Sequence, residues 1–205
     1  MKFRLFPVET RGLGLLQQLG EIVRQGVETL SELLGAPAGD QQGLIRELEQ
    51  FEQRATDLHH AVLTHLRTSY VNPLPREDLY TFSRLLNDAV AELAGAGDLM
   101  VTTSVAGISR RAAEQLEMLG RQSEMTNDAL GKLQHPDDLE DAWLQMIRLG
   151  RRARRTHRAW LGEISELSKA STILRHRAVA EQLLAAVDSL HALADHLGRV
   201  LVKES

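Results

Sequence analysis

The chain has 205 residues, of which 43% are hydrophobic and only 4% aromatic, and it contains no cysteine. This length and hydrophobic content are enough for a sizeable core, while the missing cysteine excludes disulfides and thiolate zinc sites. The formal net charge of −4 gives no overall attraction to nucleic acid. Short apolar runs and a start without an export signal predict a cytoplasmic protein with no transmembrane segment.

Apolar residues recur with helical periodicity along the chain, which predicts an all-α protein of six helices. The first is expected over about 12–34 and ends at the glycine- and proline-containing segment 35–39. The second is expected to follow Asp40, a residue type that favours the N-cap. It should end at segment 72–75, which contains two prolines.

The third predicted helix opens at Arg76, with two carboxylates in a first turn where the helix dipole favours them, and continues to about Gly107. Gly95 and Gly97 predict a kink within it. The remaining helices are expected over about 109–133, 137–167 and 171–203, the fifth opening with a run of acidic residues.

The order of elements repeats, because each half of the chain has three predicted helices. The pattern Ala55-x-x-x-His59-x-Ala61 in the first half also recurs as Ala153-x-x-x-His157-x-Ala159 in the second. These features predict one domain over 1–205, made of three-helix halves 10–107 and 109–203 around a shared core. A chance match of such short patterns is the alternative.

Signatures of catalysis are missing from the sequence: there is no cysteine, no Gly-x-Ser-x-Gly elbow and no phosphate-binding glycine loop. We therefore predict a protein that is not an enzyme. The histidines form no pair at helical i, i+4 spacing, and His191 and His196 are rotated by about 140° from each other. His59 and His157 lie near apolar stripes, which favours histidines at the edge of a core over metal ligands.

Residues 70–80, YVNPLPREDLY, resemble the junction F-[IV]-T-P-[IL]-D-R-E-D-[IL]-Y of the PhoU-like proteins. More narrowly, they resemble the branch of accessory proteins associated with Pit-type inorganic phosphate transporters. The Phe-Pro opening, the two three-helix halves and the end of the chain extend the resemblance over nearly the whole sequence. It implies a six-helix PhoU-like fold made of two three-helix bundles.

The resemblance also implies Glu/Asp-x-x-x-Asp motifs that bind iron or zinc, since acids four residues apart lie on one helix face. The corresponding positions here are Glu52 and Thr56, Asn87 and Ala91 (beside Asp88), Gly150 and Arg154, and Leu184 and Asp188. Most of the motif acids are missing. We therefore predict that the metal site is lost, that no cofactor is bound, and that Arg154 pairs with a carboxylate such as Asp188 or Glu52.

Five arginines of the fifth predicted helix share one face by their spacing: Arg148, Arg151, Arg152, Arg155 and Arg158, the arginine stripe. One interpretation is a solvated face balanced by the acidic first turn of the same helix. The other is a contact with an anion or a partner, because guanidinium groups bind phosphate and carboxylate bidentately. An acidic transporter loop, an anionic membrane surface and free phosphate all fit the second interpretation.

The resemblance thus implies a non-enzymatic accessory or regulator of Pit-type phosphate transport, acting by protein contact in the cytoplasm, including the inner face of the plasma membrane. The expected partners are the transporter's cytoplasmic face and further copies of the chain, and nucleic acid is not expected. Two alternatives remain open: a metal-binding PhoU-like protein, and a helical scaffold that binds anionic partners through the arginine stripe.

Overall fold

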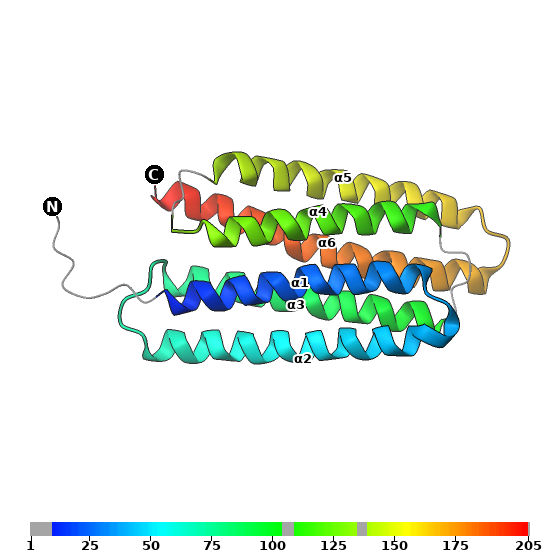
Figure 1. The fold of residues 1–205 in the computed structure, drawn as a ribbon. Coiled ribbons are helices and arrows are strands. Elements are labelled where there is room, and N and C mark those ends of the chain that lie inside the picture. The colour runs from blue at the N-terminus through cyan, green and yellow to red at the C-terminus, as the bar shows by residue number, and fades with distance from the viewer. Residues whose placement is uncertain (1–9, 104–108, 135–138, 205) are drawn as a thin grey trace.

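The computed structural model describes residues 10–103, 109–134 and 139–204, which form six helices and no strand. The helices are α1 (Arg11–Gly35), α2 (Ala38–Thr68), α3 (Arg76–Thr102), α4 (Arg110–Gly131), α5 (Glu140–Ser165) and α6 (Ala170–Glu204). They run side by side along the length of the molecule (Figure 1). The prediction of an all-α protein with six helices is confirmed.

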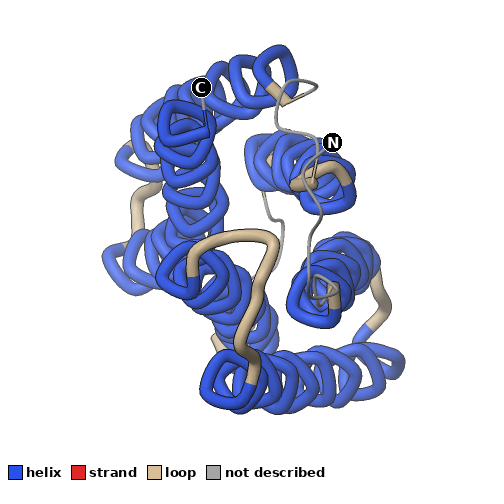
Figure 2. Tube along the Cα trace, turned by 90° about the vertical axis from the view of Figure 1, so that its left-hand side faces the viewer, coloured by secondary structure: helices blue, strands red, loops and turns tan. Residues whose placement is uncertain are grey.

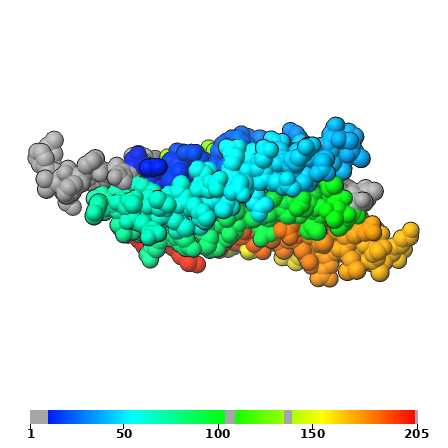
Figure 3. Space-filling model, turned by 90° about the horizontal axis from the view of Figure 1, so that it is seen from below, coloured from blue at the N-terminus to red at the C-terminus, as the bar shows by residue number. Residues whose placement is uncertain are grey.

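The helices pack as two groups of three. Helices α1, α2 and α3 contact one another, as do α4, α5 and α6, and the groups meet where α3 packs on α6 and α1 on α4. The view along the helices shows the two groups next to each other (Figure 2). Seen from below, α2 and α3 cover a long face and α6 follows its edge (Figure 3).

The apolar faces of all six helices form one continuous hydrophobic cluster. Its largest fully buried side chains include Phe82 of α3 and Trp160 of α5, so both groups contribute bulky residues. Small residues let the helices approach closely. A Cβ added at Gly97 of α3, for example, would lie 2.6 Å from Leu48 Cδ1 of α2. Gly95 and Gly97 thus make room for neighbouring helices, and α3 continues through both without interruption.

Two predicted helix ends need correction. Asp40 is not an N-cap, because α2 begins at Ala38 with Pro37 in the cap position at φ −64° and ψ 152°. The fixed φ of proline suits this entry, and the Asp40 N–H donates to Pro37 O at 2.9 Å inside the first turn. Helix α3 ends at Thr102 rather than near Gly107, which lies outside the described residues.

Helix α5 begins at Glu140. Two residues of the predicted acidic start, 137 and 138, lie outside the described residues. Helix α4 begins as expected, where the Ser109 Oγ accepts a hydrogen bond from the Arg111 N–H at 3.1 Å. In the part of the chain that the structure describes, no helix has the length and apolar character needed to cross a membrane.

Candidate functional site

The arginine stripe lies on the outer face of α5. All five of its side chains are exposed, whereas the opposite face of the helix is buried against α4 and α6. The buried residues of α5 are Met146, Gly150, Ala153, His157, Trp160 and Ile164. Because the apolar residues anchor one side of the helix, the five guanidinium groups are held on the other within an arc of about 120°.

No carboxylate of the described residues forms an ion pair with the arginines of the stripe. Over residues 10–103, 109–134 and 139–204, none of the five arginines forms a hydrogen bond or an ion pair. Several arginines elsewhere are paired, such as Arg84 with Asp88 at 2.7 Å and Arg177 with Glu181 at 2.7 Å. The acidic first turn of α5, Glu140 and Asp141, is about two turns from Arg148 and forms no ion pair with it. The stripe is therefore a concentration of exposed positive charge.

The motif positions of α2 and α3 face each other across the interface of these helices. The Thr56 Oγ1 donates to Asn87 Oδ1 at 3.4 Å, so the two positions meet, but both side chains are neutral. Asp88 binds Arg84 instead, and Glu52 is exposed. At the positions where the resemblance implies metal-binding acids, the chain therefore has the Thr56 hydroxyl and the Asn87 amide.

The motif positions of α5 and α6 are joined by an ion pair, since Arg154 Nε donates to Asp188 Oδ1 at 2.7 Å. The predicted pairing of Arg154 with an acid is confirmed, and Asp188 rather than Glu52 is the partner. Gly150, one turn earlier, packs on α6: a Cβ there would lie 3.0 Å from His191 Cγ. An acidic side chain at position 150 therefore has no space while His191 keeps its place.

Buried histidines lie beside these positions. Burial, followed by the nearby Arg154 guanidinium, lowers the pKa of His191, and burial is also the main cause that lowers the pKa of His157. On the other side of the molecule, His59 Nδ1 lies 3.0 Å from Ser83 Oγ. His59 and His157 sit at or near the core edge, as the sequence predicted. The described residues contain no group of three His, Asp or Glu side chains placed to hold a metal ion.

A charge cluster at the end of α6 was missed by the sequence analysis. Asp78 of α3 is 1% exposed, and its Oδ1 lies 3.0 Å from His196 Nε2 and 3.2 Å from Lys203 Nζ. The hydrogen bond to Asp78 raises the pKa of Lys203, while burial lowers the pKa of His196. The sequence indicated only that Asp78 is an acid in a first helical turn, where the helix dipole favours it. Nothing in the sequence pointed to contact with α6, about 120 residues later.

The junction that carries the family resemblance has a structural role in this fold. Leu74 is buried, and Arg76 Nη2 donates to Ser69 O at 2.6 Å across the connection between α2 and α3. The hydrogen bond of Arg76 thus fixes the connection between α2 and α3, and the buried Asp78 joins the start of α3 to α6. Tyr70, by contrast, is 96% exposed.

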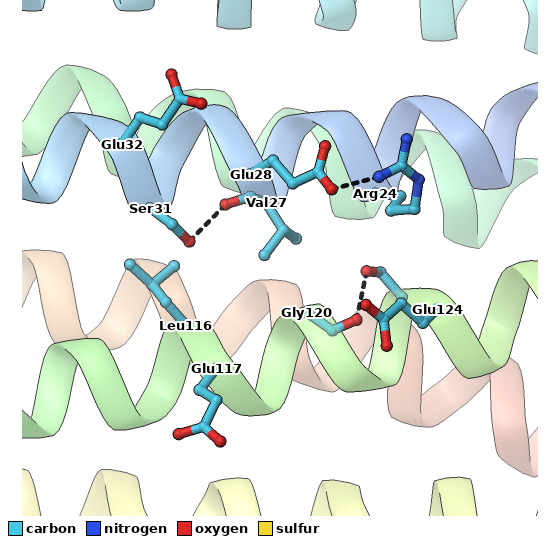
Figure 4. Close-up of a pocket in the computed structure, with 10 residues that line it drawn as sticks. Arg24, Val27, Glu28, Ser31, Glu32, Leu116, Glu117, Gly120 and Glu124 are labelled. Carbon is cyan, nitrogen blue, oxygen red and sulfur yellow. Dashed lines mark hydrogen bonds and ion pairs between the residues drawn. The ribbon is translucent and has the colours of Figure 1, made fainter.

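A second charged surface lies in a groove between α1 and α4 (Figure 4). Val27 of α1 and Leu116 of α4 point into the space between the helices. The residues that line the groove include four glutamates: Glu28, Glu32, Glu117 and Glu124. Arg24, the one cationic side chain among the residues that line the groove, binds Glu21 and Glu28. The sequence analysis did not single out this acidic groove, because its residues come from two helices about 90 residues apart.

No family model matches the chain, and no curated protein matches it.

Proposed function

We propose that this chain is a non-enzymatic accessory protein of a Pit-type inorganic phosphate transporter, which it contacts at the cytoplasmic face through the arginine stripe of α5. The observation that carries the proposal is the stripe itself: five exposed arginines on one face, without ion pairs among the described residues. Guanidinium groups held in this way favour carboxylates or phosphates presented by a partner.

The choice of transporter rests on the resemblance at residues 70–80 and on the succession of three helices followed by three more. Both support a PhoU-like protein of the Pit-associated branch. Contact with one conformation of a transporter shifts its equilibrium by the difference in affinity between its states. A brake on uptake is the form of regulation that we favour.

Metal binding does not form part of the proposal. Where the resemblance implies acids, Thr56 and Asn87 bind each other, and Arg154 places a positive charge beside Asp188. A guanidinium within a cation site opposes binding by like-charge repulsion. The remaining alternative is a scaffold for other anionic partners, which the same arginines support equally.

The test is phosphate uptake by cells that contain a fixed amount of the transporter, with and without this protein. We expect slower uptake with the protein and co-purification of the two. The double variant Arg151→Glu/Arg155→Glu should weaken binding at least about tenfold, because it replaces two attractive contacts by repulsive ones, and uptake should return to the rate without the protein. Identical kinetics in all cases, with no co-purification, would reject the proposal.

The matched control is Arg46→Glu/Arg67→Glu, which makes the same change of charge at exposed positions of α2. It should leave both binding and uptake unchanged. Binding to anionic lipid vesicles that depends on Arg151 and Arg155, without any effect on uptake, would favour the scaffold alternative.

A further inference from the structure

The groove between α1 and α4 combines an apolar floor with acidic sides. Val27, Leu116 and Gly120 form the floor, and the nearest atom to a Cβ added at Gly120 would be Val27 Cγ1 at 3.9 Å. The absent side chain at position 120 therefore keeps the groove open. Such a surface suits long side chains that have apolar stems and a positive end.

The acids of the groove are only partly compensated. Glu28 binds Arg24, and Glu117 binds Arg121 at 2.6 Å. Glu32 and Glu124 are exposed and form no ion pair within the described residues. Arg24 in turn is shared with Glu21. The groove thus keeps an excess of negative charge.

The acidic groove and the arginine stripe lie on either side of α4, at the same height. Helix α4 packs against α1 on one side and α5 on the other, and α4 lies between them in Figure 1. Glu117 lines the groove, and it also lines the crevice between α4 and α5 together with Arg152 and Leu149. One face of the molecule therefore carries negative charge on one side of α4 and positive charge on the other.

The two charged surfaces also agree in length. The groove follows nine residues of α1, from Arg24 to Glu32, and nine of α4, from Leu116 to Glu124. The eight helical rises in each segment span about 12 Å. The stripe covers eleven residues of α5, from Arg148 to Arg158, and its ten helical rises span about 15 Å. Arg151 and Arg155 are four residues apart, as are Glu28 and Glu32, so the charges repeat with the same helical period.

We propose that the face made by α1, α4 and α5 joins two copies of this chain about a twofold axis parallel to α4. Rotation by 180° about such an axis places α5 of each copy over the groove of the other and keeps the heights along the helices. Both sets of opposite charges then meet at once, and the interface closes into a dimer. A second copy is the occupant because the same face supplies both the acidic groove and the cationic ridge that complements it.

The dimer does not depend on the proposed function. It covers the arginine stripe, so an anionic partner that binds the stripe competes with the second copy and shifts the protein toward the monomer.

The experiment is sedimentation velocity over a range of protein concentrations at low salt. We expect the wild-type chain to dimerise, and 1 M salt to weaken the dimer because it shortens the Debye length to about 3 Å. The variants Glu32→Lys/Glu124→Lys and Arg151→Glu/Arg155→Glu should each raise the dissociation constant of the dimer at least about tenfold. Neither variant removes an ion pair of the described structure, and circular dichroism verifies that both remain helical.

The decisive sample is an equimolar mixture of the two variants. Each alone opposes like charges, but a mixed pair has opposite charges at both contacts, so dimers should return at nearly the wild-type dissociation constant. A wild-type chain that stays monomeric up to about 100 μM, variants that dimerise like wild type, or a mixture that stays monomeric would each overturn the proposal.

The controls are charge reversals of the same size on α2, at the exposed residues Glu49 and Glu52 to Lys, and Arg46 and Arg67 to Glu. Both should dimerise like the wild type. Equal weakening by these controls would attribute the effect to net charge and overturn the assigned surface.

Discussion

Asp78 shows how one buried charge joins the start of α3 to the C-terminal part of α6. Its carboxylate accepts a hydrogen bond from Lys203 Nζ and lies beside His196, and both of these residues belong to α6. Asp78 also lies in the first turn of α3, where the helix dipole favours a negative charge. These contacts offset the cost of burying the charge.

Replacing Asp78 by Asn should lower the free energy of unfolding by about 2–3 kcal/mol, because the partners of a buried charge lose their counterion. Urea denaturation measures the change. The control Asp57→Asn, at an exposed position of α2, should remain within about 0.5 kcal/mol of wild type. Equal effects of the two substitutions would show that Asp78 has no special role in stability.

The histidines predict a pH dependence of stability. Burial is the main cause that lowers the pKa of each of five histidines, namely His59, His157, His176, His191 and His196. Their folded pKa values lie below about 6.5, the ordinary value of an exposed histidine. Below that pH the unfolded chain binds more protons than the folded one, so stability falls as the pH decreases.

We therefore expect the urea midpoint to fall between about pH 7 and pH 5, with each histidine contributing at most about 1.4 kcal/mol per pH unit. Replacing His157 by Gln should reduce the slope, since the titrating group is removed. A slope that is unchanged in this variant would contradict the assignment of His157.

At the scale of single elements, α5 contains two glycines in opposite situations. Gly150 is buried against His191, where a Cβ would come within 3.0 Å of the imidazole Cγ, whereas Gly162 is exposed and has no atom within 4 Å of an added Cβ. The same substitution therefore has opposite expected effects on one helix.

Gly150→Ala should destabilise the fold by about 1–3 kcal/mol, because the packed imidazole has to shift. Gly162→Ala should stabilise it by about 0.5–1 kcal/mol through helix propensity alone. Thermal and urea unfolding measure the stability of both variants. A gain of stability in both would mean that His191 can move at little cost and that the packing of Gly150 on α6 is not tight.

The ion pair of Arg154 and Asp188 should contribute less to the free energy of unfolding than the packing of Gly150. Its side chains are 39% and 45% exposed, so solvent screens their attraction, and Arg154→Ala should cost no more than about 1 kcal/mol. If Arg154→Ala instead lowered the free energy of unfolding by several kcal/mol in urea denaturation, the ion pair would have a major role in holding α5 on α6.

At the scale of the whole molecule, both groups of three helices share one hydrophobic cluster. They are also tied by polar contacts, such as the hydrogen bond between Gln182 of α6 and Glu92 of α3. A shared core predicts that the halves unfold together.

The two tryptophans test this expectation, because Trp143 and Trp160 both belong to α5 and report on the second group alone. Far-UV circular dichroism reports on all six helices. We expect the fluorescence and dichroism transitions in urea to coincide. A separate dichroism transition without a change of fluorescence would show that the first group of helices unfolds independently.

The sequence by itself determined the six helices and the common face of the arginine stripe. These features follow from local chemistry, since apolar periodicity, proline and glycine act within a few residues of the chain. The predicted pairing of Arg154 was also within reach, because a cation beside an apolar stripe requires a nearby acid.

Only the tertiary structure decided which helices meet, and therefore which distant side chains share a surface. The acidic groove needs α1 beside α4, and the partners of Asp78 need α6 beside α3. The role of Gly150 likewise depends on His191 of another helix. Helical periodicity specifies the face of each helix but not its neighbour, because many pairings bury apolar faces of similar composition equally well.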